Sequence, residues 1–168
     1  MAKEHALVKR LSAVETLGCT TVICSDKTGT LTQNEMTVSN LWLPEGEYQV
    51  TGLGYAPTGS IMAGERQVTA AGTPGLNLLL TAASLCSNAR VVSPETKEDR
   101  YTVLGDPTEA CLGVVAEKAG IHVDEQLAAM PRVRELPFDS RRKRMTTIHA
   151  LTKPVDGCQR VAYVKGAP

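Results

Sequence analysis

The sequence predicts an α+β domain, in which helices flank an antiparallel sheet, over residues 34–168, preceded by an α/β segment over residues 1–33. Residues 37–43 alternate between apolar and polar side chains and run into a Pro-Glu-Gly turn, which is typical of a β-hairpin. Further runs with strand character follow at residues 133–138, 145–148 and 160–164. Runs of strands together with two or three helices favour an antiparallel α+β fold.

Two helices are expected within this domain, and each begins with a polar residue followed by proline. The Thr-Pro pair at residues 73–74 precedes a helical pattern that extends to about Asn88, so Thr73 is expected to cap this helix. The Asp-Pro pair at residues 106–107 begins a second helix, which is expected to end just before Gly120.

The remaining segments carry weaker patterns. Residues 7–17 have leucine and valine side chains at helical spacing, and Gly18 follows as a stop. Residues 52–75 are rich in glycine and proline and are expected to form loops and short strands. Residues 90–100 are charged and contain proline, which predicts an exposed connection, and a short strand is expected at 101–104.

Composition and charge exclude several classes of protein. The 168 residues carry 18 Lys and Arg against 18 Asp and Glu, so no global basic field would attract nucleic acid. No run approaches the ~20 apolar residues that a membrane-spanning helix needs, and no signal peptide is expected. The five cysteines include no C-x-x-C pair and the three histidines are scattered. Reduced thiols that act as small apolar side chains are therefore expected, and a zinc site is not.

A carboxylate follows a β-branched, apolar run near the start of the chain. Residues 20–24 are typical of a strand buried on both faces of a parallel sheet, and Asp26 comes two residues after its end. Ligands of open α/β sheets bind beyond the carboxyl ends of the strands, where a carboxylate can attack a phosphoryl group and hold it covalently. Lys27 can offset negative charge there, and Gly29 lets the backbone turn closely around a ligand. The alternative is that Asp26 only caps a polar turn.

The heptapeptide DKTGTLT at residues 26–32 resembles the phosphorylation motif of P-type ATPases, the cation pumps that pass through an aspartyl-phosphate. The match extends through residues 14–19 before the motif and 33–38 after it. The resemblance implies that residues 1–33 are a stub of the α/β phosphorylation domain. It also implies that residues 34–168 are the nucleotide-binding domain, incomplete at its C-terminal end.

The resemblance further assigns roles within the motif. It implies that Asp26 is the phosphorylated nucleophile. The catalytic loop would also include Lys27, Thr28 and Thr30. In an intact pump, Mg²⁺ would be held by the Asp26 carboxylate, the main-chain carbonyl of Thr28 and a distant aspartate that this sequence does not contain. Because Thr28 stands where related phosphatases place a second aspartate, the phosphoenzyme is expected to hydrolyse slowly.

Three further segments resemble, in the same order, the nucleotide-binding motifs of these pumps. In the first, GDPTEA at residues 105–110, Glu109 would reach the adenine end of ATP and accept from its amino group. Asp106 is either a ligand contact or only a partner of the helix dipole, and both interpretations stay open. In the last, the terminal KGAP, Lys165 would project into the nucleotide pocket and Gly166 would permit a close approach.

The middle segment, PFDSRRKRM at residues 137–145, combines an aromatic side chain with cations. Phe138 would stack on adenine, contributing about 1–3 kcal/mol, although the only phenylalanine of the chain could equally be a core residue. Lys143 matches a family cation that faces the triphosphate. Ser140 stands where calcium pumps of the animal reticulum type have an arginine, and Arg141 is a candidate to replace it.

The resemblance as a whole implies the ATP-binding part of a type II, calcium-pump-like cation-transporting ATPase, with ATP and Mg²⁺ as cofactors. Its partners would be the membrane, actuator and remaining phosphorylation domains of the pump. It would lie at the cytoplasmic face of the membrane, as part of an integral membrane protein. The chain by itself is expected to be inactive, and the transported ion stays open, with Ca²⁺ as the first candidate.

Two alternatives to a pump stay open. One is a phosphatase of the haloacid dehalogenase type, which shares the aspartyl nucleophile, and Thr28 in place of an acidic residue argues against it. The other is a non-catalytic adenine-nucleotide-binding module. Because a strand at 20–24 would lack sheet partners, the chain is also expected either to dimerise through an open sheet edge or to leave residues 1–33 irregular.

Overall fold

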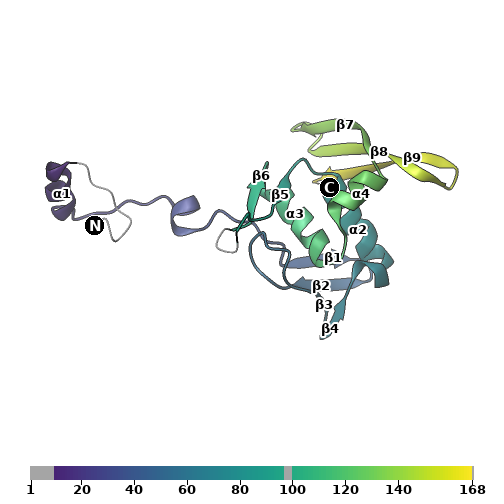
Figure 1. Ribbon diagram of the computed structural model, residues 1–168, viewed down its shortest axis with the longest axis horizontal. Coiled ribbons are helices and arrows are strands. Elements are labelled where there is room, and N and C mark those ends of the chain that lie inside the picture. The colour runs from purple at the N-terminus through teal and green to yellow at the C-terminus, as the bar shows by residue number, and fades with distance from the viewer. Residues whose placement is uncertain (1–9, 97–99, 168) are drawn as a thin grey trace. The chain divides into compact units, whose positions relative to one another are not determined.

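The computed structural model describes residues 10–96 and 100–167, and the chain divides into two compact units. The first unit is Met1–Asn34 and the second is Glu35–Pro168. Elements carry the labels of Figure 1, and each unit has its own fold. Among the described residues, none of the helices combines the length and the apolar character that a membrane crossing requires.

In its described residues, 10–34, the first unit contains one short helix and one tight turn. Helix α1 spans Leu11–Gly18, which confirms a helix in this region and its stop at glycine. The expected helix over residues 7–17 begins earlier, but residues 7–9 lie outside the described part of the chain. The turn at Lys27–Leu31 follows an irregular segment.

The strand expected at residues 20–24 does not form. The whole segment is exposed and has no regular structure, and the Ile23 side chain is 88% exposed. A strand buried on both faces needs neighbouring strands and covering helices, and the described residues of the first unit offer neither. The apolar pattern is therefore present without the sheet that would bury it, and the prediction of this strand was wrong.

The second unit begins with a four-stranded antiparallel sheet. Its strands pair in the order of the chain and are β1 (Asn40–Leu43), β2 (Gly46–Val50), β3 (Ile61–Ala63) and β4 (Arg66–Val68). The hairpin predicted from residues 37–43 onward is confirmed, with Leu41 opposite Tyr48. The short strands expected between residues 52 and 75 are β3 and β4, and a 3₁₀ turn at Ala70–Gly72 follows them.

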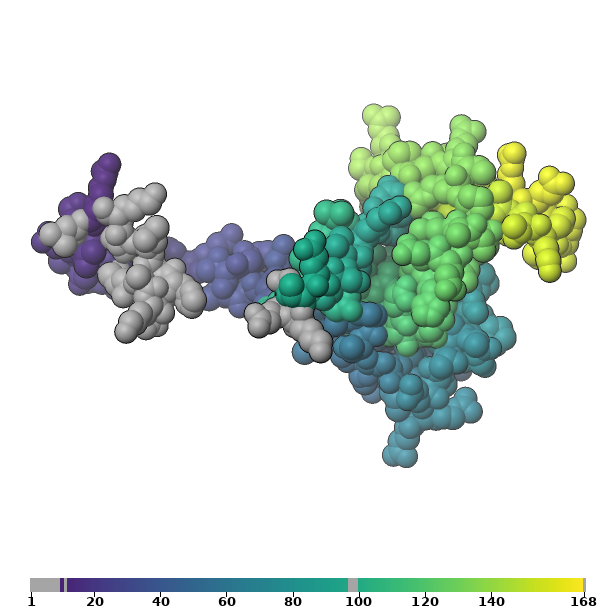
Figure 2. Space-filling model, viewed as in Figure 1, coloured from purple at the N-terminus to yellow at the C-terminus, as the bar shows by residue number. Residues whose placement is uncertain are grey.

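A three-stranded antiparallel sheet ends the chain. Its order is β7-β8-β9, with β7 at Arg132–Asp139, β8 at Arg144–Val155 and β9 at Cys158–Gly166. All three strands were predicted, and each is longer than its sequence pattern because the hairpins continue past the apolar positions. In the space-filling view, the exposed end of the β8–β9 hairpin projects from the body of the second unit (Figure 2).

A small two-stranded sheet lies between these larger ones in the sequence. It pairs β5 (Arg90–Val92) with β6 (Thr102–Leu104) in antiparallel register. The strand expected at residues 101–104 is thus confirmed. Residues 90–100 were expected to be an exposed connection, of which 97–99 lie outside the described residues. Arg90 and Val92 are indeed exposed, but residues 90–92 form a strand, because Val91 pairs with Val103 across the ladder, so this part of the prediction was wrong.

Both predicted helices of the second unit are present. Helix α2 spans Pro74–Leu85 and helix α3 spans Pro107–Lys118. Thr73 occupies the N-cap position of α2, but its side chain makes no capping hydrogen bond, so that part of the prediction was wrong. Gly120 ends α3 with a φ of 84°, a left-handed conformation that glycine adopts without steric cost.

A third helix, α4 at Val123–Ala129, was not predicted. It has seven residues, which is too short for a helical period to stand out in the sequence. Its first backbone amide, that of Val123, donates to the Glu117 carboxylate at 2.8 Å. A side chain at the end of α3 therefore holds the start of α4.

Within the second unit, helices α2, α3 and α4 lie between the β1–β4 sheet and the β7–β9 sheet (Figure 1). The larger core cluster joins the first sheet to α2 and α3 around Ile61, Leu76 and Leu80. A second cluster, built from Leu85, Cys86, Met145 and Tyr163, joins the end of α2 to β8 and β9. The end of α2 is thereby fixed next to the C-terminal sheet.

The cysteines follow the expectation only in part. All five are free thiols, and Cys86 and Cys111 are buried as apolar side chains. Cys19, Cys24 and Cys158 are exposed, which the composition did not indicate. The second unit, taken by itself, is a small α+β domain with antiparallel sheets and helices, as the sequence predicted.

Candidate functional site

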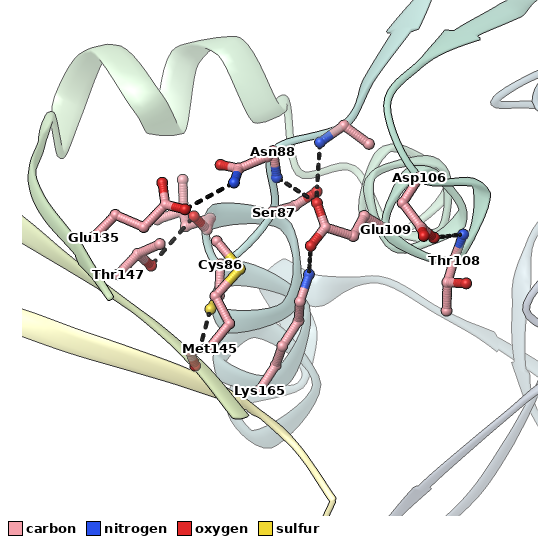
Figure 3. A network of polar contacts seen from close by, with 12 residues as sticks. Cys86, Ser87, Asn88, Asp106, Thr108, Glu109, Glu135, Met145, Thr147 and Lys165 are labelled. Atoms are coloured by element: carbon pink, nitrogen blue, oxygen red, sulfur yellow. Dashed lines mark hydrogen bonds and ion pairs between the residues drawn. The ribbon is translucent and has the colours of Figure 1, made fainter. Parts of the chain in front are cut away.

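Two predicted site residues from distant parts of the sequence form an ion pair. The Lys165 ammonium lies 2.7 Å from Oε1 of Glu109, joining the end of β9 to the first turn of α3 (Figure 3). Only 25% of the Lys165 side chain and 19% of the Glu109 side chain is exposed. The pair is therefore partly shielded from solvent, where charge-assisted hydrogen bonds are stronger than at an open surface.

The second oxygen of Glu109 faces the connection between α2 and β5. Oε2 accepts from the backbone amide of Asn88 at 2.6 Å and from the hydroxyl of Ser87 at 3.5 Å. Partial burial pushes the pKa of the Glu109 carboxyl upward, but the hydrogen bonds from Lys165 and Asn88 outweigh it and lower the pKa below its ordinary value. Glu109 is consequently a carboxylate at neutral pH, with both oxygens engaged.

The start of α3 explains why Glu109 is where it is. Asp106 is the N-cap, and its Oδ1 accepts from the backbone amide of Thr108 at 2.7 Å, with Pro107 in the first turn. The hydrogen bonds from Thr108 lower the pKa of the Asp106 carboxyl. Of the two interpretations left open for Asp106, the structure supports the cap, and a ligand contact stays a prediction.

The aromatic candidate is on the surface. Phe138, near the end of β7, is 63% exposed, so the alternative in which it is a core residue is wrong. An exposed phenylalanine offers a flat apolar face to solvent, which is the geometry that a stacking platform needs.

The turn after Phe138 is built by one carboxylate. Oδ1 of Asp139 accepts from the amides of Arg141 and Arg142 at 3.0 and 2.9 Å, and the Arg142 guanidinium donates to the carbonyl of Pro137 at 2.9 Å. Lys143 follows with a φ of 51°. The side chains of Arg141 and Lys143 are exposed, so these two predicted cations stand on a turn that Asp139 orders.

Gly166 is required by the neighbouring strand. A Cβ atom added to it would lie 2.2 Å from the carbonyl oxygen of Lys143 and 2.6 Å from Cα of Arg144. The adjacent amide of Ala167 donates to that Lys143 carbonyl at 3.0 Å. The close approach predicted at Gly166 therefore exists, but the approaching group is the β7–β8 turn of the chain itself.

These contacts tie three predicted segments together. The segment at residues 105–110 meets the terminal KGAP through the Glu109–Lys165 pair. The KGAP segment meets the basic turn through the hydrogen bond from Ala167 to Lys143. Segments that are far apart in the sequence are thus in direct contact within the second unit.

The DKTGTLT loop belongs to the first unit and is exposed throughout. Gly29 has a φ of 75°, and the amide of Thr32 donates to the carbonyl of Lys27 at 3.1 Å, closing the turn. The Asp26 carboxylate makes no capping hydrogen bond to this turn, which argues against the alternative of a mere cap. Thr28 and Thr30 lie inside the same turn.

The loop by itself offers fewer ligands than a magnesium ion needs. Within the described ranges, no group of three or more His, Cys, Asp or Glu side chains is placed to hold a metal ion. Mg²⁺ takes about six oxygen ligands and commonly uses one or two carboxylates plus phosphates and waters. The Asp26 carboxylate and the Thr28 carbonyl are oxygen ligands of the kind that Mg²⁺ binds. The other ligands would have to come from phosphate, water or other residues.

Four residues of the site were missed by sequence reasoning. Ser87 and Asn88 hold Glu109, while Arg132 and Glu135 contact Asn88 in turn. No motif marks them: Ser87 and Asn88 fall at the end of the predicted helix, Arg132 just before a predicted strand and Glu135 inside that strand. Their role depends on which helix end meets which strand, and this is decided by tertiary packing.

One groove of the second unit is lined by other residues than those of the predicted site. It has a volume of about 440 Å³ and is formed by the 3₁₀ turn, α2, α4 and Tyr163 of β9. None of the predicted nucleotide-binding residues lines it.

Comparison with known proteins identifies the family. Residues 75–168, more than half of the chain, match the family model described as "P-type ATPase, cytoplasmic domain N". The chain therefore belongs to the P-type cation-transporting ATPase family.

Individual relatives agree with this assignment. The chain is 43% identical over 168 residues to "Probable cation-transporting ATPase F" of Mycobacterium tuberculosis strain H37Rv, covering 99% of this chain and 18% of that protein. It is 39% identical to "Calcium-transporting ATPase" of Bacillus subtilis, covering 100% and 18%. It is 36% identical to "Calcium-transporting ATPase type 2C member 1" of Bos taurus, covering 99% and 17%. The chain thus spans less than a fifth of the length of these relatives.

Proposed function

We propose that the second unit is the nucleotide-binding domain of a cation-transporting P-type ATPase and that ATP binds on the surface shared by its three motif segments. Phe138 would stack on the adenine ring. The ammonium of Lys165 and the side chains of Lys143 and Arg141 would face the phosphates. The observation that carries the proposal is the linkage of the three segments by the Glu109–Lys165 pair and the Ala167–Lys143 hydrogen bond.

The physical character of this surface supports a nucleotide. Phe138 is exposed and is followed in the sequence by the exposed cations Arg141 and Lys143, and this combination matches both halves of ATP, a base with a π-face and a polyphosphate. Stacking on one aromatic ring contributes about 1–3 kcal/mol, which corresponds to roughly a 5–150-fold change in affinity. The ammonium of Lys165 is a point charge that can leave one carboxylate oxygen for a phosphate oxygen.

A calorimetric titration of the 168-residue chain with ATP tests this proposal. Phe138→Ala and Lys165→Ala are expected to weaken binding at least fivefold each. Trp42→Ala and Lys153→Ala are matched controls, since both side chains are exposed on other parts of the second unit, and they are expected to leave binding unchanged. Saturable binding that responds equally to the controls, or no binding by a folded chain, would contradict the proposed site.

For the parent pump we propose that Asp26 is phosphorylated during ATP-driven cation transport at the cytoplasmic face of a membrane. Its carboxylate oxygen would form a bond to the γ-phosphorus while the bond to the β–γ bridging oxygen breaks and ADP leaves. Mg²⁺ held by Asp26 and the Thr28 carbonyl would neutralise charge on the phosphates. Lys27 and Thr30 would line the transferred group. Two relatives are named calcium-transporting, so Ca²⁺ is the first cation to test.

Incorporation of labelled phosphate from γ-labelled ATP into the full-length parent tests this second proposal. The wild-type protein is expected to retain label in acid, and Asp26→Asn is expected to retain none. Thr30→Ser, which keeps the hydroxyl, is expected to retain most of it. Label that survives in Asp26→Asn would contradict the role of this carboxylate, and full transport by that variant would favour a non-catalytic nucleotide-binding module.

A further inference from the structure

The carboxylate of Glu109 is held by a segment that has no regular structure of its own. Residues 86–89 connect α2 to β5, and they supply the Asn88 amide and the Ser87 hydroxyl that Glu109 accepts. Ser87 is itself oriented, because its Oγ accepts from the amide of Ala89 at 3.2 Å. The position of the carboxylate therefore depends on whatever fixes this connection.

One guanidinium binds the connection at several points. Nη2 of Arg132 donates to the carbonyl of Leu85 at 2.9 Å and to the carbonyl of Ser87 at 2.6 Å. These carbonyls lie at the C-terminal end of α2, where a cation is favourable and where backbone oxygens lack partners within the helix. Nη1 donates to Oδ1 of Asn88 and to Oε2 of Glu135, the latter at 2.9 Å.

The side chain of Asn88 is held at both ends. Its oxygen accepts from Arg132, and its nitrogen donates to Oε1 of Glu135 at 2.9 Å. Arg132 and Glu135 are themselves paired, so the three side chains form a closed ring. Figure 3 shows the Asn88 end of this ring, with the backbone amide of Asn88 directed at Glu109 and its side chain at Glu135.

We propose that Arg132 is a positioning residue of the site: together with Glu135 it fixes Asn88, which fixes Glu109, which in turn places the Lys165 ammonium. Arg132 touches neither Glu109 nor Lys165 through any contact of the described residues, and it is not placed against the ligand. Lys165 is thus kept at a defined point by Glu109, which the backbone amide of Asn88 holds, while the side chains of Arg132 and Glu135 hold Asn88, and these contacts form a relay. This inference deepens the proposed ATP site and rests on it for its functional consequence.

The relay also changes the role of Glu109. One oxygen is occupied by Lys165, and the other by the Asn88 amide and the Ser87 hydroxyl. A carboxylate offers about four acceptor sites, and protein donors take at least three of them. The main role of Glu109 is therefore to hold Lys165, and an amino group of adenine could donate only to the acceptor site that the protein donors leave.

The pKa of the Glu109 carboxyl tests the relay without any ligand. In Arg132→Met the Asn88 amide is expected to lose its alignment, so the pKa measured from the Glu109 carboxyl carbon by NMR should rise by about one unit. Arg134→Met is the matched control, since Arg134 is exposed two residues further along β7 and its guanidinium has no partner among the described residues. Its Glu109 pKa is expected to equal that of the wild type.

A second variant guards against loss of the fold. Asn88→Ala removes the clamped side chain but leaves its amide and the contacts of Arg132 with α2, and it is expected to raise the same pKa by a smaller amount. An unchanged Glu109 pKa in a folded Arg132→Met chain, or in Asn88→Ala if Arg132→Met unfolds, overturns the proposal.

ATP affinity provides the functional readout. Calorimetry of the 168-residue chain is expected to give a three- to tenfold weaker ATP affinity for Arg132→Met than for Arg134→Met. Arg132→Lys is expected to have an affinity between these two, because one ammonium cannot reach all four acceptors of the guanidinium. If wild-type ATP binding is absent, the proposed function fails while the pKa measurement still decides the relay. A pKa shift without any change in a measurable affinity overturns the functional part of the inference.

Discussion

The two motif-bearing regions of this chain differ in how far other segments of the chain bury and contact them. The DKTGTLT loop of the first unit is exposed and closed by its own backbone, and its Asp26 carboxylate is free of the turn. Glu109 in the second unit is 81% shielded at its side chain and is held by donors from two other segments. The first motif lies on an exposed segment outside any sheet, whereas the carboxylate of the second is held by contacts from neighbouring segments. The heptapeptide therefore forms a turn through its own backbone, but no other part of the described chain holds its Asp26 carboxylate.

The difference in burial predicts the largest effect. Leu80 is 1% exposed in the core between α2 and the first sheet, so Leu80→Ala is expected to lower the free energy of unfolding by about 2–5 kcal/mol. Ile23 in the first unit is 88% exposed, and Ile23→Ala is expected to change it by no more than about 0.5 kcal/mol. Urea denaturation followed by circular dichroism measures both. Similar losses for the two variants would mean that residues 20–24 are packed after all.

Sequence alone predicted most of the second unit because its patterns are local. Proline in the first turn predicted helices α2 and α3. Alternation of apolar and polar side chains, together with turn residues, predicted the hairpins. Helix α4 was missed because seven residues are too few for a helical period to be visible. Strand β5 was missed because its residues begin a charged, proline-containing run that favours an exposed connection. The strand at 20–24 failed for the opposite reason: its pattern is clear, but its burial depends on a sheet that the described residues do not form.

For the candidate site, the sequence predicted the residues that belong to motifs but not the contacts between them. Glu109, Phe138, Lys143 and Lys165 carry motif identity and could be named in advance. That Lys165 pairs with Glu109, and that Arg132 and Asn88 support the pair, follows from the way the end of α2 packs against the C-terminal sheet. Contacts of this kind leave no spacing rule in the sequence.

The close approach at Gly166 gives the next largest effect. Gly166→Ala would force a methyl group against the backbone of the β7–β8 turn and is expected to cost about 1–3 kcal/mol of unfolding free energy. Gly113→Ala is the control, because nothing lies within 4 Å of its added Cβ in helix α3, and it is expected to be neutral or stabilising. Thermal unfolding compares the two. Equal melting temperatures would show that the turn can move away from β9, which would contradict a fixed contact between Gly166 and the β7–β8 turn.

The smallest effect is the pH dependence of Glu109. Its pKa is lower in the folded chain than its ordinary value of 4.5, so its contribution to stability is fully present above that value and is lost as pH falls through the folded pKa. Glu109→Gln is therefore expected to be less stable than the wild type by about 1 kcal/mol at pH 7, with the difference shrinking below pH 4.5. Urea denaturation at several pH values measures this. A difference that is constant with pH would contradict a carboxylate held by Lys165 and Asn88.

The central claim is that the second unit carries a built nucleotide site, and amide NMR during an ATP titration tests it most directly. The account predicts saturable shifts at Glu109, Phe138, Lys143 and Lys165, with the amides of residues 26–32 unmoved. Shifts confined to the groove around Thr81 and Tyr163, or spread evenly over both units, would contradict it.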